Sequence, residues 1–237
     1  FKGLKTVKRI CIFIFALTFL FICACSPHNE ITYSNKEKGD YVKSYSVKKS
    51  KPYNSVSAEV LIFDEEEILK RTDLVVKGTI LSETEIALEE YRENKLYHTY
   101  YRGVFELEIN HVFEYKDAQF KKGDIIRIGN AVCSKHWYEG SKKLEKGKEY
   151  ILFLRKAIDT ETVKFSQSCD YYVLHPWQSI VTIKDNKYEF DEAFISLKEN
   201  AMEKVNEEYT WIKYYKKDKA FESELQNLLK KKGGESK

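Results

Sequence analysis

Between residues 74 and 190 the sequence contains five or six short segments with the pattern of β-strands, separated by turn signals. In the clearest of them, Phe105, Leu107 and Ile109 alternate with polar residues, as on a strand with one buried face. Residues 150–154 are almost continuously apolar, which predicts a strand buried on both faces. Short strands at this spacing predict a small sheet that is either closed as a barrel or folded as a sandwich.

Turn and helix signals divide the rest of this region. An acidic segment at residues 64–71 predicts a short helix, because Asp64 can cap its first turn and acidic residues favour that end of the helix dipole. Gly78 lies inside the first predicted strand and indicates a bulge or bend there. The remaining strands and turns are predicted at residues 74–81, 122–124, 125–128, 146–148, 171–174, 179–183, 185–187 and 188–190.

After residue 190 the apolar spacing changes from two residues to three or four. Asp191 is the candidate N-cap of an amphipathic helix, and Phe221, Leu225 and Leu229 mark a second helix that ends near residues 230–234. These signals predict a helical appendage at residues 191–232 and a disordered tail at residues 233–237. The predicted fold class is therefore mainly β, with a C-terminal amphipathic helical tail that makes the whole α+β.

The N-terminal segment carries the most specific motif. Four cations and no acid precede an uncharged apolar run, the arrangement of an export signal over residues 1–24. The run ends in Ile22, Cys23, Ala24 and Cys25, which resembles a bacterial lipobox and predicts lipidation of Cys25. The alternative is an uncleaved membrane anchor, but the run is short against the roughly 20 apolar residues that span a bilayer. Residues 25–57 are polar and predict a lipid-anchored tether, so we expect the protein on the extracytoplasmic face of the cell membrane.

Removal of this signal changes the charge and the cysteine count. The net charge of +3 includes the four cations of the signal, so the mature chain carries −1 and offers no reason to expect nucleic acid as a partner. Among the five cysteines, two leave with the signal and Cys25 is lipidated. Cys133 and Cys169 remain, and two thiols in an exported protein predict a disulfide between them.

No strong catalytic motif is present: the chain has no HExxH, no GxSxG and no phosphate-binding glycine loop. A zinc site built from Cys133, His136, Cys169, Asp170 and His175 is an alternative to the disulfide, but the spacing matches no paired ligand motif. We therefore assign no catalytic residue, no metal and no cofactor from the sequence, and we expect a binding module rather than an enzyme.

Four segments carry a resemblance to a known family, namely "RTDLVVKGTIL", an alternating strand that ends near "HVFEYKDAQFKKGDIIRI", then "CSKHW" and "LEKGKEYILFL". The residues that fit its strand motifs are Asp73, Val75, Gly78, Leu144, Gly147, Tyr150 and Leu152. Over about residues 60–185 the chain resembles the netrin-like family, which includes the tissue inhibitors of metalloproteinases and members among bacterial lipoproteins. This resemblance implies an OB-like β-barrel domain, at residues 58–190. The animal inhibitors chelate zinc through a free N-terminal cysteine, whereas Cys25 here is expected to be lipidated, so that mechanism is not carried over.

Aromatic residues indicate where such a domain would bind. "YRENKLYHTYYRG" at residues 91–103 predicts a tyrosine-rich loop between strands, and Trp137 follows in a second segment. Loops of OB folds border the ligand-binding face, so Tyr97, Tyr100, Tyr101 and Trp137 are the candidate binding residues; the alternative is that these rings cover the barrel ends. The predicted function is a lipid-anchored interaction module of the bacterial cell envelope that binds a protein or a glycan. The alternative is an extracytoplasmic hydrolase or protease inhibitor without a recognisable motif.

Overall fold

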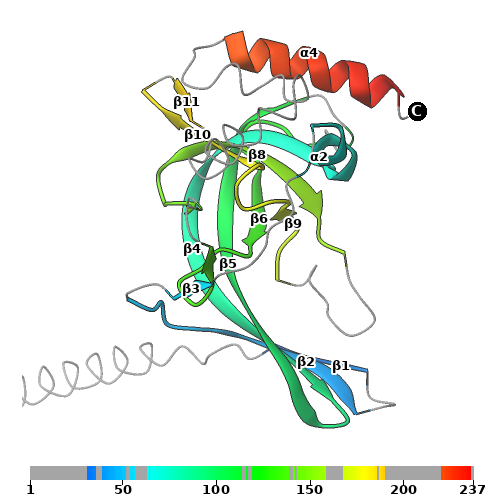
Figure 1. The fold of residues 1–237 in the computed structure, drawn as a ribbon, viewed down its shortest axis with the longest axis vertical. Coiled ribbons are helices and arrows are strands. Elements are labelled where there is room, and N and C mark those ends of the chain that lie inside the picture. Colours follow the sequence, from blue (N-terminus) through cyan, green and yellow to red (C-terminus); the bar gives the residue numbers. More distant parts are fainter. Residues whose placement is uncertain are drawn as a thin grey trace, which may run out of the picture.

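The computed structural model describes residues 31–35, 39–51, 54–56, 63, 65–113, 116, 119–138, 141, 143–158, 168–185, 187–189 and 220–235. Strands dominate this part of the chain, as predicted (Figure 1). In chain order the elements are β1 (Ile31–Asn35), β2 (Asp40–Ser46), β3 (Ser55–Val56), α2 (Glu65–Arg71), β4 (Leu74–Arg92), β5 (Lys95–Val112), β6 (Ile125–Asn130), β7 (Trp137–Tyr138), β8 (Glu149–Lys156), β9 (Tyr171–Val173), β10 (Ile180–Lys184), β11 (Lys187–Glu189) and α4 (Ala220–Glu235). The helix predicted from Asp191, the export signal and Cys25 lie outside the described residues.

The two longest strands, β4 and β5, form one long antiparallel hairpin within the larger sheet. Their connection is a tight turn at Glu93 and Asn94, where both residues have positive φ angles, 50° and 61°. Two-residue hairpin turns require this left-handed conformation, and asparagine adopts it more readily than most residues. The hairpin therefore continues well beyond the strand predicted at residues 74–81.

Five strands of the larger sheet are joined in a series of pairings that returns to its starting strand. β5 pairs with β6, β6 runs parallel to β9, β9 pairs with β8, and β8 pairs with β4. β10 and β11 extend the sheet from β8, whereas β1 and β2 extend it from β4. β3 and β7 form a separate two-stranded parallel sheet.

β8 is buried on both faces, as its continuous apolar sequence predicts. Leu152 and Leu154 point into one apolar cluster, which also receives Phe105, Leu107 and Ile109 from β5. A second cluster covers the opposite face, with the residues Ile68, Leu69, Val75, Phe113, Ile151, Phe153, Trp177, Val181, Tyr188, Phe221, Leu225 and Leu229. Burial of apolar area contributes about 25 cal/mol per Å², so these two clusters are the main source of stability.

The two helices cover the second cluster. α2 contributes Ile68 and Leu69, and α4 contributes Phe221, Leu225 and Leu229 at the spacing of one helical face. α4 lies across the end of the molecule beside β10 and β11 (Figure 1). The helix predicted around Phe221 is confirmed. However, α4 extends to Glu235, so the disordered tail predicted from residue 233 is wrong over residues 233–235.

Gly78 is a bulge position, as predicted, because the pairing of β4 with β5 shifts between Lys77 and Gly78. A Cβ atom at Gly78 would lie 2.5 Å from the carbonyl oxygen of Glu108 and 2.8 Å from Cδ1 of Leu107. Only glycine allows the two strands to approach this closely.

Residues 31–35 and 40–46 form β1 and β2, although the sequence predicted a polar tether over residues 25–57. In β2 only Val42 and Ser44 are buried, so the strand has almost no apolar alternation to reveal it. Among the described residues, no helix combines the length and the apolar character that membrane crossing requires.

Candidate interaction surface

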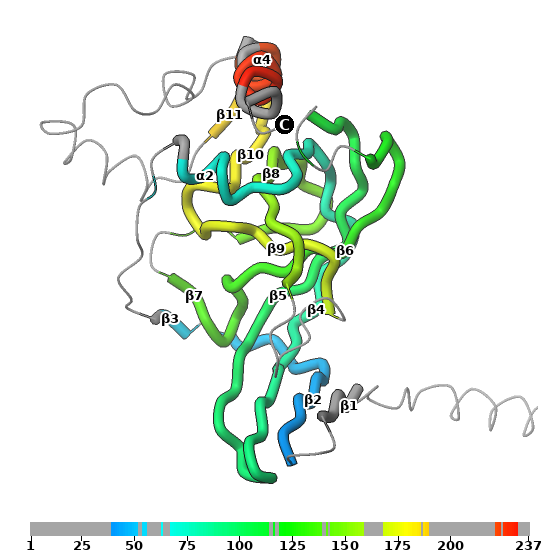
Figure 2. Tube along the Cα trace, turned by 90° about the vertical axis from the view of Figure 1, so that its right-hand side faces the viewer, coloured from blue at the N-terminus to red at the C-terminus, as the bar shows by residue number. Residues whose placement is uncertain are grey.

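β1, β2, residues 85–92 of β4 and residues 95–102 of β5 form a projection that we call the arm. It extends away from the remainder of the structure, which we call the body (Figures 1 and 2). The arm begins where the pairing of β5 with β6 ends, at Gly103. The tyrosine-rich loop predicted at residues 91–103 is wrong, because these residues belong to β4, β5 and their two-residue turn.

One face of the arm is a network of tyrosine and carboxylate groups. Glu89 accepts hydrogen bonds from the hydroxyl groups of Tyr45, at 2.6 Å, and Tyr91, at 2.8 Å. The Tyr91 ring stacks on Tyr41 with their centroids 4.5 Å apart, and Lys43 lies over the same ring at 5.4 Å. The hydrogen bond to Glu89, followed by burial, raises the pKa of Tyr45 to about 12.

The opposite face contains a small apolar cluster of Val42, Ile86 and Leu88, with Tyr100 and Val104 packed against it. The Tyr100 hydroxyl group lies 3.5 Å from the carboxylate of Glu90. Burial raises the pKa of Tyr100, and the nearby negative charge of Glu90 raises it further. Tyr100 is therefore part of the packing of the arm.

Glu90 is buried, although glutamate is usually a solvated surface residue. Glu90 is only 2% exposed, and its carboxylate accepts a hydrogen bond of 2.9 Å from Nε of Arg92. The Arg92 guanidinium group in turn lies 3.6 Å from the centre of the Tyr97 ring. Because Arg92 and Glu90 are paired with each other, the other exposed charges beside the turn are those of Glu93 and Lys95.

Leu96 and Tyr97 are the exposed apolar residues of the arm, with 53% and 59% of their surface accessible. Tyr97 is the extra residue of a bulge, since Glu90 pairs with His98 whereas Tyr91 pairs with Leu96. A bulge re-aims a side chain, which accounts for the outward position of this ring. Of the four candidate binding residues, Tyr97 is the one that the structure places in solvent.

Tyr101 and Trp137 occupy different surroundings. Tyr101 is half-buried on the strand beside Tyr100. Trp137 belongs to β7, donates a hydrogen bond of 3.1 Å from Nε1 to the carbonyl oxygen of Ser141, and packs under Lys143. The four predicted residues therefore do not form one continuous surface, because Trp137 is on a different sheet.

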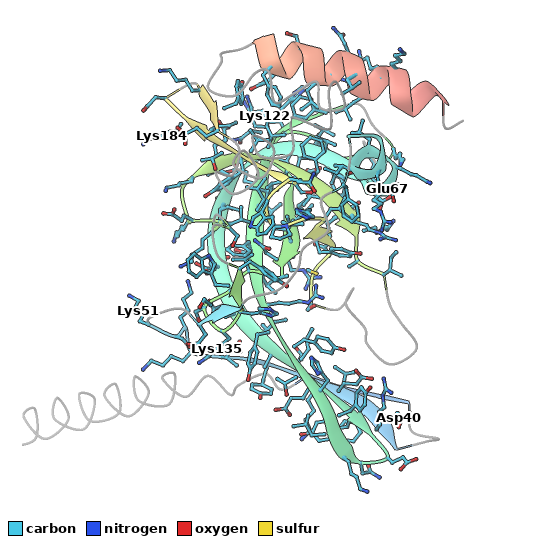
Figure 3. The ribbon with its side chains drawn as sticks, in the orientation of Figure 1. Asp40, Lys51, Glu67, Lys122, Lys135 and Lys184 are labelled. Atoms are coloured by element: carbon cyan, nitrogen blue, oxygen red, sulfur yellow. The ribbon has the colours of Figure 1, made fainter. Side chains whose placement is uncertain are left out.

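A buried carboxylate fastens the arm to the body, and no local pattern in the sequence predicts this contact. Glu85 is 2% exposed and accepts a hydrogen bond of 2.6 Å from the backbone N–H of Ser134 and a second one from its hydroxyl group. The backbone N–H of Ser50 donates to the same hydroxyl oxygen at 2.6 Å. Lys49 forms an ion pair with Glu83 nearby. Figure 3 shows this region around its labelled neighbours Lys51 and Lys135.

Cys133 and Cys169 are both buried, and the structure places no disulfide between them. Burial raises the pKa of both thiols, and the charge of Arg102 opposes this shift only at Cys169. Their charged neighbours differ: Glu85 and Glu83 lie near Cys133, whereas Arg102 and Arg127 lie near Cys169. The disulfide stays a prediction.

The two histidines considered as zinc ligands form hydrogen bonds or backbone contacts within the fold. His175 Nδ1 accepts hydrogen bonds from the backbone N–H groups of Trp177, at 3.2 Å, and Gln178, at 3.1 Å, and so holds a turn. His136 forms a backbone bridge with Cys133, and burial lowers the pKa of its imidazole. Within the described part of the chain, no group of three or more His, Cys, Asp or Glu side chains is arranged to hold a metal ion.

Comparisons of this chain with protein-family models, with curated proteins and with solved structures gave no match. The class of protein that the described residues define is therefore given by the architecture alone. It is a mainly β body with a projecting strand arm.

Proposed function

We propose that this protein is a lipoprotein held on the extracytoplasmic face of the cell membrane through Cys25. The proposal is supported by the basic segment, the apolar run and the lipobox that precede this cysteine. Two lipid chains on one residue give stable anchoring, whereas a single chain binds the membrane only marginally. β1 begins at Ile31, so the strand arm follows the anchor closely in the sequence.

We further propose that the body is an OB-like barrel, the fold implied by the resemblance to the netrin-like family. An OB fold is a five-stranded Greek-key barrel. The series β4, β5, β6, β9, β8 and again β4 supports this assignment, because it joins five strands and contains one parallel pair. The body would then act as the scaffold that presents the arm.

The arm is the binding element of this proposal, and its ligand is a protein or a glycan of the cell envelope. The observation that carries the proposal is the exposure of Leu96 and Tyr97, two large apolar side chains that are consecutive in the sequence on a projecting strand. Soluble proteins rarely leave adjacent large apolar groups in water unless the surface serves binding. Aromatic residues flanked by arginine, as in the Tyr97 and Arg92 pair, are typical of the residues that dominate binding energy.

Metabolic labelling with an alkyne analogue of palmitate tests the anchor. The wild-type protein should incorporate the label, and Cys25→Ala should lose it. Cys133→Ala is the matched control, because the same residue type is replaced at a buried position. Equal labelling of the wild type and Cys25→Ala would contradict the proposed anchor.

Recovery of partners from intact cell envelopes tests the arm. The full chain in detergent is compared with a Leu96→Ser, Tyr97→Ser double variant and with a control in which exposed Ile158 is replaced by serine. We expect the arm variant to lose the bound material and the control to keep it. Equal recovery with all three proteins would show that the arm does not make the contact.

A further inference from the structure

The outer edge of β5 in the arm is an exposed strand edge. β4 pairs with residues 95–101 on one side, and the pairing with β6 on the other side stops at Gly103. No strand among the described residues pairs with this outer edge, and β5 lies on the side of the arm away from β2 (Figure 2). Such an edge presents backbone N–H and C=O groups to which another chain can add a strand.

The side chains along this edge determine which kind of strand fits it. Residues 95–101 include the cation Lys95 and no acidic residue, and the exposed Glu93 lies just outside this edge, in the turn. Leu96 and Tyr97 are exposed beside them. A strand that alternates acidic residues with β-branched or aromatic residues would place a carboxylate opposite Lys95 and cover the exposed side chains of Leu96 and Tyr97.

We propose that the arm binds a partner protein by strand addition to residues 95–101 of β5, and that the added segment is an extended, acidic stretch of that partner. This inference rests on the proposed function, because it specifies how the arm binds. A glycan cannot complete a backbone ladder of this kind, so the proposal selects a protein ligand.

A second copy of this chain is the less favourable occupant. Antiparallel pairing of two β5 edges would bring Lys95 and His98 of both copies to the same edge without any acidic residue to oppose them. The bulge at Tyr97 and the lysine at the tip are also features that discourage flat edge-to-edge association of identical strands. A short peptide needs only a few of these residues and can adapt to the bulge.

The test uses the full chain in lipid nanodiscs and a phage library that displays random twelve-residue peptides. Selection on the wild-type protein should enrich peptides with alternating acidic and β-forming residues and without internal proline. A Lys95→Glu, His98→Glu variant should retain these phages at least tenfold less well. A Lys122→Glu, Lys184→Glu variant is the matched control, because both of these lysines are remote from the arm (Figure 3).

The most enriched peptide is then synthesised with a fluorescent label, and its affinity is measured by anisotropy. Proline at its centre should weaken binding at least tenfold, because it removes a backbone donor and breaks the strand. No enrichment, equal affinity of the proline peptide, or equal losses in both charge variants would overturn the proposal. A concentration-dependent dimer that the Lys95→Glu, His98→Glu variant alters would also overturn it in favour of a second copy.

Failure of strand addition is distinguishable from failure of the proposed function. If the Leu96→Ser, Tyr97→Ser variant loses its partner from envelopes but the proline peptide binds as well as the original, the arm binds through its exposed side chains. The proposed function would then stand, and the strand-addition mechanism would be wrong.

Discussion

The body and the arm are parts of one sheet, yet different interactions hold them together. The body buries two extensive apolar clusters on opposite faces of β8. Among the described side chains of the arm, the buried apolar cluster consists of Val42, Ile86 and Leu88, and many of the other contacts involve tyrosine rings, tyrosine hydroxyl groups and carboxylates. Hydrogen bonds to charged groups contribute about 1.5–3 kcal/mol each, which is less in total than the burial of two apolar clusters. The comparison indicates a stable scaffold that carries a more weakly held element.

This difference matters for function because proteins open locally where few apolar contacts hold the chain, and binding segments are commonly taken from such regions. If the arm is the binding element, as proposed, we expect the body to keep its fold while the arm adapts to a ligand. The contact between Glu85 and Ser134 then has a defined role, since it fixes the base of the arm to the body.

The largest effect on stability is expected at Phe153, which is fully buried in the second apolar cluster of the body. Phe153→Ala should lower the free energy of unfolding by about 3–5 kcal/mol, because it removes a large apolar side chain and leaves a cavity. Urea denaturation followed by circular dichroism measures this change. A decrease in the free energy of unfolding below about 1 kcal/mol would mean that the second apolar cluster is not a core, and the distinction between body and arm would fail.

An intermediate effect is expected at Glu85. Glu85→Gln removes a charged acceptor from the two hydrogen bonds of Ser134, and hydrogen bonds to charged groups contribute about 1.5–3 kcal/mol. Hydrogen exchange should become faster in the arm and at residues 132–136 and stay unchanged in β8. Glu106→Gln is the control, because Glu106 accepts a hydrogen bond from Ser82 on an exposed surface. Faster exchange throughout the body would contradict the role of Glu85 as a local attachment.

A smaller, pH-dependent effect is expected where α4 contacts the body. Burial alone would raise the pKa of Glu222, but hydrogen bonds from Lys77, at 2.8 Å, and Tyr188, at 2.5 Å, outweigh it and lower the pKa below 4.5. A lowered folded-state pKa means that the stabilisation is complete above 4.5 and is lost as the pH falls through the folded value.

The protection factors of the α4 amides, which relate each exchange rate to its intrinsic rate at the same pH, should therefore fall selectively as the solution is acidified below pH 4.5. Glu222→Gln removes the titrating group, so the protection factors of α4 in this variant should show no such fall. If the variant and the wild type respond to acid alike, the attachment of α4 does not depend on Glu222.

The smallest effect on stability is expected at Tyr97. Tyr97→Ala should change the free energy of unfolding by less than about 0.5 kcal/mol, because the ring is mostly in solvent. Tyr100→Ala should cost more, because this ring packs on the apolar cluster of the arm. Melting temperatures of the two variants measure the difference, and the reverse order would mean that Tyr97, not Tyr100, supports the arm.

Most strands of the body can be predicted from the sequence, because the burial of one or both faces requires a recognisable pattern of apolar residues. The alternation of Phe105, Leu107 and Ile109 and the continuous apolar run of β8 each follow directly from which faces are covered. Gly78 was predicted as a bulge because a glycine inside a strand usually marks a close approach. The apolar face of α4 follows from its three- and four-residue spacing, whereas α2 is predicted by the acidic residues at its start.

The arm was not predicted, because its strands bury few apolar residues and its turn contains no glycine. Residues 91–103 were assigned to a loop from their polar and aromatic composition, although Glu93 and Asn94 alone make the turn. The contact of Glu85 with Ser134 joins residues 49 positions apart, so no local pattern could reveal it. The sequence predicts Tyr97 as a binding residue. It does not show that Tyr97 and Trp137 belong to different sheets, because this follows from which strands pair.

Site-specific photocross-linking in living cells tests most directly the claim that the arm, and not the body, makes the functional contact. Benzoylphenylalanine is placed at Tyr97 in the arm or at Ile158 in the body, two large and exposed apolar positions. The account predicts a discrete cross-linked protein adduct from position 97 and none from position 158. An adduct from position 158 alone, or adducts of equal yield from both, would contradict it.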